Sequence, residues 1–198
     1  MLLPLQRSSE DIFEPGYLAE PPLVRFVAYA RQQRLSGWVH LQADRLTDLL
    51  NAHDELLLAE VEVESLLDGT TRTAAALVVE RRDLVAVYAS GPRGDEARRR
   101  PSRTHPVAVQ SANFLIGGLL HAPVGVDPLA DFRGRPPMVP LSDAWIEFWL
   151  DGRRRFDLGT GTLIVNRERA DAVWEVTVND LADGLLHPPL LHESARAG

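Results

Sequence analysis

The chain has 198 residues, a formal net charge of −7 at neutral pH, and 45% hydrophobic and 25% charged residues. That charge gives no long-range attraction to phosphate or acidic lipid, which argues against nucleic acid and membrane surfaces as partners. The sequence contains no cysteine, which excludes disulfides, thiolate metal sites and cysteine nucleophiles. The start, MLLPLQRSSE, lacks the basic region and cleavage site of a secretory signal, and no window reaches about 20 apolar residues, so we expect a cytoplasmic protein.

In the first half of the chain, apolar or alternating runs rich in valine and aromatic residues predict antiparallel strands. The runs are residues 23–30, 36–41, 55–65, 75–80 and 84–89. Between the second and third runs, the segment DRLTDLLN (44–51) carries Leu46, Leu49 and Leu50 at helical spacing, which predicts one short amphipathic helical turn.

Residues 91–106 are rich in glycine, proline and charge and predict a linker, after which a second set of strand-like runs begins. The second set comprises residues 107–110, 114–121, 138–150, 161–166 and 170–178. We therefore predict an N-terminal extension (1–22), a first β-barrel repeat (23–90), the linker, a second β-barrel repeat (107–180) and a C-terminal tail (181–198). The outer parts of both tails, 1–15 and 189–198, are expected to pack poorly.

The two sets of runs match in order, which indicates an internal duplication. Gly118 and His121 follow Gly37 and His40 by 81 residues, and the Asp-x-Leu-x-Asp frame that starts at Asp44 recurs 83 residues later at Asp127. The closing segments, residues 77–88 and 163–174, match at a separation of 86 residues, with the gaps falling in polar loops. The predicted fold is thus all-β and mainly antiparallel: a tandem duplication of a small five-stranded barrel-like unit with a short helical turn in each copy. Two such small units are expected to pack together, edge to edge or face to face.

The motif RLTDLLN (45–51), preceded by GWVHL and followed by the hairpin ALVVERRDLVAVY, resembles an uncharacterised bacterial domain family with an RLSDLLN-like segment and a closing hairpin. The second copy is degenerate, since Pro128 and Gly134 replace Arg45 and Asn51. The chain also resembles, more weakly, small Sm-like and SH3-like barrels in strand number and hairpin placement. The resemblance implies no reaction and no cofactor.

The segment DRLTDLLN has a structural and a functional interpretation. In the structural one, Asp44 caps the helical turn and Asn51 ends it in a left-handed conformation. In the functional one, Arg45, Asp48 and Asn51 face a protein partner. Caps and turn terminators use these residue types for local reasons, and this favours the structural interpretation.

Two aromatic residues of the second half, Trp145 and Trp149, share one face of a predicted strand. That face is either core between the two units or a docking site for another chain. Four arginines of the linker, Arg98, Arg99, Arg100 and Arg103, form a basic cluster that is either solvated or binds an anion.

No constellation in the sequence combines a nucleophile, a base and an oxyanion site, so we predict no enzyme, and no metal or cofactor. The expected function is that of a non-catalytic binding or assembly module whose partner is another protein or a second copy. The alternative is a receptor for a small molecule or nucleotide, similar to PilZ-type receptors, that uses the arginine linker. The chain lacks the Asp/Asn-x-Ser-x-x-Gly pattern of those receptors.

Overall fold

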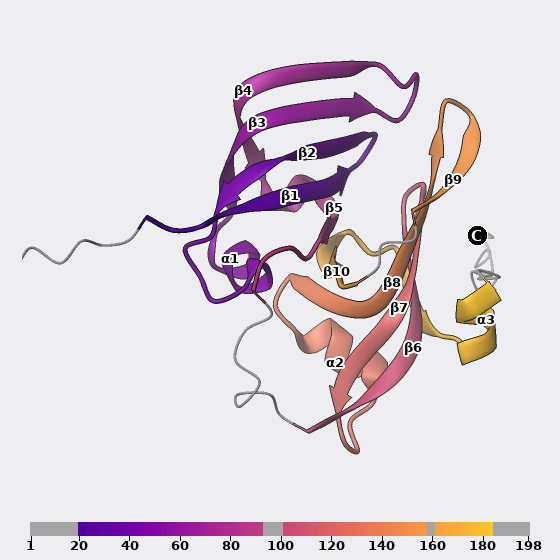
Figure 1. The fold of residues 1–198 in the computed structure, drawn as a ribbon. Helices are drawn as coiled ribbons and strands as arrows, with labels where there is room; N and C mark the ends of the chain where they lie inside the picture. The colour runs from indigo at the N-terminus through magenta and orange to yellow at the C-terminus, as the bar shows by residue number, and fades with distance from the viewer. Residues whose placement is uncertain (1–19, 93–100, 158–160, 184–198) are drawn as a thin grey trace, which may run out of the picture.

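The structure is a computed structural model that describes residues 20–92, 101–157 and 161–183. Within these ranges the chain forms an 11-stranded sheet in which every pairing is antiparallel, so the predicted all-β class is confirmed (Figure 1). The first half holds β1 (Leu23–Ala30), β2 (Gln33–His40), β3 (Glu55–Ser65), β4 (Thr71–Glu80) and β5 (Leu84–Tyr88). The second half holds β6 (Ser102–Ser111), β7 (Phe114–Pro123), β8 (Met138–Leu150), β9 (Arg153–Asp157), β10 (Leu163–Asn166) and β11 (Ala172–Glu175).

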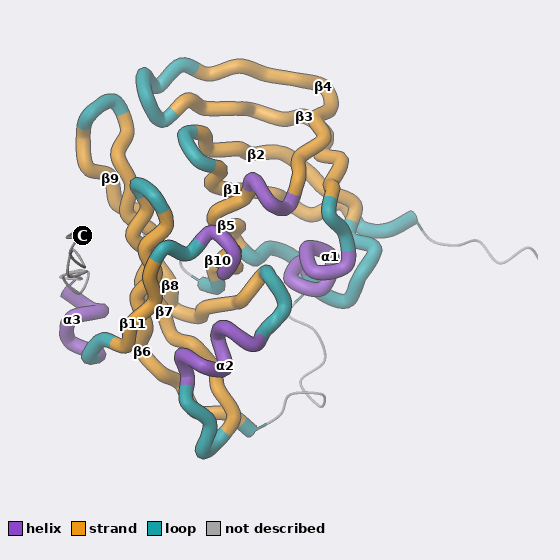
Figure 2. The backbone as a smooth tube through the Cα atoms, turned by 180° about the vertical axis from the view of Figure 1, so that it is seen from behind, coloured by secondary structure: helices purple, strands orange, loops and turns teal. Residues whose placement is uncertain are grey.

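Short helices connect these strands, as Figure 2 shows in purple. They are α1 (Leu46–Ala52), α2 (Pro128–Gly134) and α3 (Val178–Asp183), with 3-10 turns η1 (Arg81–Asp83) and η3 (Arg167–Arg169). The predicted helical turn thus occurs in both halves, at α1 and α2. Among the described residues, no helix has the length and apolar character needed to cross a membrane.

The strands follow one path, β11-β6-β7-β8-β10-β5-β1-β2-β3-β4, with β9 paired to β8. The two halves meet edge to edge where β5 pairs with β10, placing Tyr88 opposite Leu163 and Val87 opposite Ile164. We call this pairing the junction. In the described part of the chain the path is open, with β4 and β11 at its ends, and the predicted closure of each half into its own barrel is not confirmed.

Each half has a shift in strand register at the point where its sheet bends. The pairing of β2 with β3 shifts between Ser36 and Trp38, and that of β7 with β8 shifts between Gly117 and Leu119. Close packing at each bend requires glycine, because a Cβ on Gly37 would lie 2.9 Å from the carbonyl oxygen of Ala59 and one on Gly118 would lie 2.9 Å from the Cβ of Ala144. The bulged strands carry Glu60 and Asp143 at positive φ, 50° and 47°.

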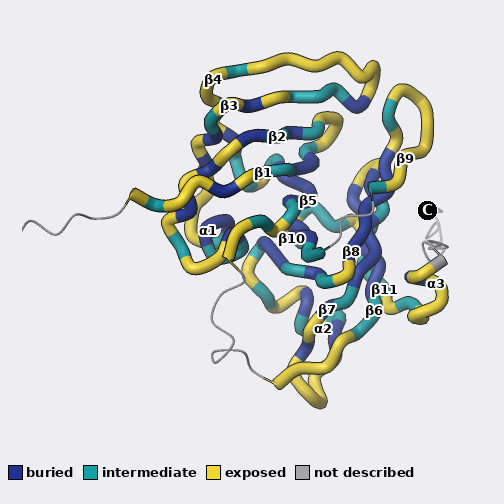
Figure 3. Tube along the Cα trace, viewed as in Figure 1, coloured by how far each residue is buried: buried dark blue, intermediate teal, exposed yellow. Residues whose placement is uncertain are grey.

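Each half completes the hydrophobic core of the other. Met138 and Ile164 of the second half belong to the cluster built around Phe26, Leu50 and Leu58 of the first. Conversely, Tyr29 of the first half lies among the core residues of the second, with its ring 5.8 Å from Phe114 and 5.0 Å from Phe148. Figure 3 shows this buried interior as dark blue segments on both sides of the junction.

Three elements differ from the sequence prediction. Strand β6 begins at Ser102, inside the stretch predicted as linker, because residues 102–106 pair with the end of β7. Strand β9 was predicted as loop, since RRRFD has no apolar alternation, but the long strand β8 offers it backbone partners. Helix α3 extends past the predicted end of the second repeat at residue 180, because Leu181 is buried against Trp145 and Ala108.

Candidate protein-binding interface

The side chains of Arg45 and Asp48 form a salt bridge on the surface beside α1. Arg45 donates from Nε and Nη2 to the two carboxylate oxygens of Asp48, at 2.8 and 2.7 Å. The positive charge of Arg45 and the negative charge of Asp48 cancel. The two side chains are 49% and 38% exposed, so both remain accessible from solvent. Asp131 at the equivalent position of α2 also binds an arginine, Arg135, at 2.8 Å. Both halves therefore use this aspartate to hold a nearby guanidinium group.

The N-cap of α1 lies one residue later than the predicted Asp44. The N-cap residue of α1 is Arg45, whose side chain makes no capping bond, and the carbonyl of Arg45 accepts from the amides of Asp48 and Leu49. In α2 the aspartate that aligns with Asp44 does cap the helix. Asp127 is the N-cap, and its carboxylate accepts from the amide of Leu129 at 2.9 Å.

Asn51 lies inside α1 and its side chain faces the second half of the protein. Its amide group donates to the carbonyl of Met138 at 3.0 Å and accepts from the amide of Met138 at 2.9 Å. The predicted left-handed helix end at Asn51 is therefore wrong, and the helix continues to Ala52. Since both hydrogen-bonding groups of its side chain are used within the chain, Asn51 fastens α1 to β8.

The two tryptophans of β8 have different surroundings. Trp145 is 6% exposed, donates from Nε1 to the carbonyl of Leu181 at 3.1 Å, and has its ring 4.8 Å from that of Phe156. Trp149 is 53% exposed and stands opposite Arg154 of β9. Trp145 is thus core beneath α3, whereas Trp149 keeps the exposure that a binding residue requires.

The predicted anion-binding cluster is described only in part. Arg103 is exposed on β6, where it pairs with Ala122 of β7. Arg98, Arg99 and Arg100 lie outside the described residues, so the receptor alternative stays a prediction.

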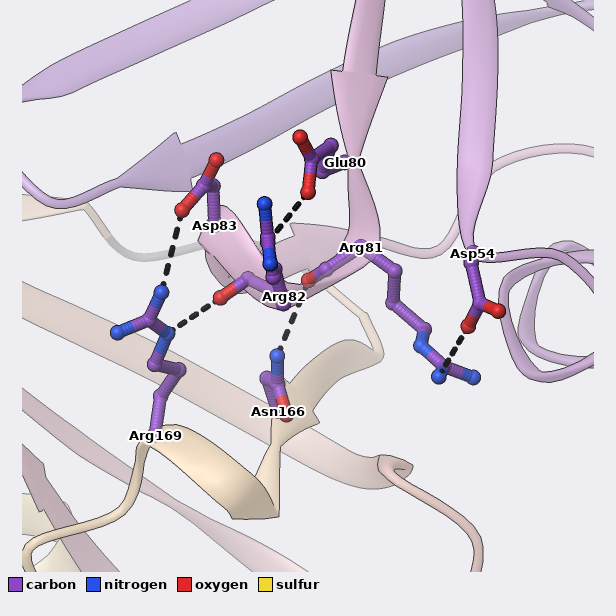
Figure 4. Close-up of polar contacts among 7 residues, drawn as sticks. All are labelled: Asp54, Glu80, Arg81, Arg82, Asp83, Asn166 and Arg169. Atoms are coloured by element: carbon purple, nitrogen blue, oxygen red, sulfur yellow. Dashed lines mark hydrogen bonds and ion pairs between the residues drawn. The ribbon is translucent and has the colours of Figure 1, made fainter.

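Two polar groupings that sequence reasoning missed come from residues far apart in the chain. At the junction, the buried Asn166 donates to the carbonyls of Arg81 and Leu84. Figure 4 shows the bond to Arg81, together with the contacts of Arg169 with the carbonyl of Arg82 and the carboxylate of Asp83. These bonds hold the two 3-10 turns together. The only sequence signal was the matching position of Glu80 and Asn166 before each turn.

The second grouping is a serine–histidine pair, Ser142 Oγ and His121 Nε2, 2.7 Å apart on β8 and β7. In the described part of the chain this is the only hydrogen bond made by the His121 ring, and a catalytic imidazole needs a further group to orient it. The hydroxyl of Tyr29 donates to Asp157 at 2.7 Å, and burial, followed by this bond, raises the pKa of Tyr29 far above the usual range.

An apolar surface patch lies at the free edge of the first half. Leu57 of β3 and Val78 of β4 stand opposite each other and are 64% and 59% exposed. Trp38 of β2, 39% exposed, pairs with Ala59 and so lies diagonal to Leu57 on the same face. We call Trp38, Leu57 and Val78 the edge patch. Figure 3 shows β4 as a mostly exposed strand at the margin of the fold.

An edge strand with exposed apolar side chains presents both unpaired backbone groups and a hydrophobic surface. A strand of another protein can pair with such an edge and cover its apolar side chains. The fold and this site therefore define the class of an antiparallel β-sheet protein with a free apolar edge. No family model, no curated protein and no solved structure matches the chain. Among the described residues, no group of three or more histidine, aspartate and glutamate side chains is arranged to hold a metal ion.

Proposed function

We propose that the chain is a non-catalytic binding or assembly module that adds a strand of a partner protein to the free edge of β4. The observation that carries the proposal is the exposure of Val78 on an edge strand, directly opposite the exposed Leu57. Exposed apolar side chains on an edge strand invite uncontrolled pairing unless a partner covers them.

The proposal includes a tandem duplication of one five-stranded unit, supported by the order of elements and by register. The orders β5-β1-β2-β3-β4 and β11-β6-β7-β8-β10 use equivalent strands, with a helix after the second and a 3-10 turn before the last. Pairs Glu55↔Glu80 and Met138↔Asn166 occupy matching positions. The likeness to an uncharacterised bacterial family, the weaker likeness to Sm-like and SH3-like barrels, and a cytoplasmic location remain part of this proposal.

Capture of partners from native lysate tests the proposed edge. Val78→Lys should remove the captured proteins, because it places a charge within the apolar edge patch, while leaving the fold intact at an exposed position. The control is Thr73→Lys, which changes an exposed residue of the same strand outside the edge patch. If the Val78→Lys chain captured the same proteins as wild type, β4 would not be the binding edge.

A further inference from the structure

The strands at the two ends of the described path are equivalent, in the sequence alignment of the two halves, to the two strands that pair at the junction. The junction pairs β5, the last strand of the first half, with β10 of the second. At the separation of 86 residues found in the sequence, β10 is equivalent to residues 77–80 of β4, and β11 is equivalent to residues 86–89 at β5. In the described part of the chain, β4 and β11 at the ends of the path are therefore a second pair of complementary edges.

We propose that β4 of one copy of the chain pairs with β11 of a second copy and so repeats the junction between molecules. The inference rests on the proposed function, because it names the partner of the β4 edge. The junction register places Ile164 opposite Val87, with Leu163 and Val165 opposite Tyr88 and Ala86. The equivalent register between copies places Val78 opposite Val173, with Leu77 and Val79 opposite Trp174 and Ala172.

Burial along the two edges agrees with this register. At the junction, Leu163 and Val165 face the core of their own half, whereas Ile164 is fully buried in the core of the other half. On β4, Val79 is likewise buried and Leu77 packs against its own core, but Val78 is 59% exposed. Val78 is thus the one residue of the three whose side chain faces away from its own half.

A pocket beside β11 has the position required to receive Val78. It measures about 130 Å³ and is lined by Phe132 of α2, Ala170, Ala172 and Val173, together with the charged residues Arg133, Arg167 and Asp171. Three of the equivalent residues of the first half, Leu49, Leu84 and Val87, share the core cluster into which Ile164 packs. The fourth, Ala86, lies on the strand that pairs with β10 but belongs to the other cluster. An apolar side chain on an added strand would enter the pocket as Ile164 enters the first core.

The contact between copies lacks two polar interactions of the junction. Glu80 stands where the junction has Asn166, and Gly134 stands where it has Asn51. Both asparagines bind backbone groups across the junction. The contact between copies is therefore weaker than the junction and reversible. Because its two surfaces differ, it is head-to-tail and joins molecules into a ring or a chain.

Engineered cysteines test the register, since the sequence contains no native cysteine. Residues directly opposite on antiparallel strands lie within disulfide range, at about 4.5–5.5 Å between Cα atoms. When a Val78→Cys chain is mixed with a Val173→Cys chain under mild oxidation, the mixed disulfide should be the main product. A Thr73→Cys chain mixed with the same Val173→Cys chain serves as the control and should give several-fold less.

Equal yields from both mixtures, or no mixed disulfide at all, would overturn the inference. Cross-linking of Val78→Cys to itself as the main product would do the same, because it would mean that β4 pairs with β4. If the wild-type chain stays monomeric while Val78→Lys still abolishes capture of another protein, the second copy is ruled out and the proposed function stands. If Val78→Lys leaves capture unchanged, the proposed function itself fails.

Substitutions that should strengthen self-association of the chain also test the contact between copies. The double variant Glu80→Asn with Gly134→Asn gives both edges the amides found at the junction, and a Cβ on Gly134 meets no atom within 4 Å. Self-association measured by sedimentation velocity should strengthen about tenfold or more, the effect of roughly one to two net hydrogen bonds. Adding Val78→Lys to the double variant should reverse the gain, and a double variant no tighter than wild type would contradict the proposed alignment.

Discussion

Replacing Ile164 with alanine should lower the free energy of unfolding by about 2–5 kcal/mol. Ile164 is fully buried, lies in β10 opposite Val87, and belongs to the core cluster of the other half of the protein. Its loss leaves a cavity at the junction, where strand pairing on both sides limits relaxation.

The control for this substitution is the equivalent residue on the free edge. Val78→Ala should change the free energy of unfolding of the monomer by less than about 0.5 kcal/mol, because Val78 is 59% exposed. Urea denaturation at low protein concentration measures both. Equal losses of stability in the two variants would mean that the junction contributes no more than an exposed edge.

Replacing Phe114 with alanine should lower the free energy of unfolding by about 3–5 kcal/mol. Phe114 is 1% exposed, and its ring lies 5.8 Å from Tyr29 and 6.4 Å from Phe148. Because Tyr29 comes from the first half and Phe114 from the second, the loss should destabilise both halves together.

Circular dichroism and tryptophan fluorescence should therefore report a single, coincident unfolding transition in both wild type and the Phe114→Ala variant. Val124→Ala, at a 59% exposed position of the same half, should leave the midpoint unchanged. Two separate transitions, of which Phe114→Ala shifts only one, would contradict the shared core.

The strands and helical turns that carry a hydrophobic period could be predicted from sequence, since burial of one face imposes that period. Runs at residues 23–30, 55–65 and 138–150 coincide with β1, β3 and β8. Gly37 and Gly118, which align between the two sets of runs, each lie where the sheet bends and leaves no room for a Cβ.

The polar contacts could not be predicted, because their partners come from distant parts of the chain. The amide of Asn51 has the same local appearance as a helix terminator, yet the backbone of Met138, 87 residues away, determines its role. For Trp145 the deciding neighbour is Leu181, in a six-residue helix with little apolar pattern. The edge patch was equally hidden, since exposure of Val78 depends on β4 lying at the end of the sheet.

The central claim is that β4 and β11, the strands at the two ends of the described path, are complementary binding surfaces. Amide hydrogen exchange measured over a range of protein concentrations tests it most directly, because strand addition protects edge amides. Exchange should slow with rising concentration in peptides covering residues 71–80 and 172–175, and should stay constant across β3, which already pairs on both sides. Exchange at both edges that is independent of concentration would contradict the claim.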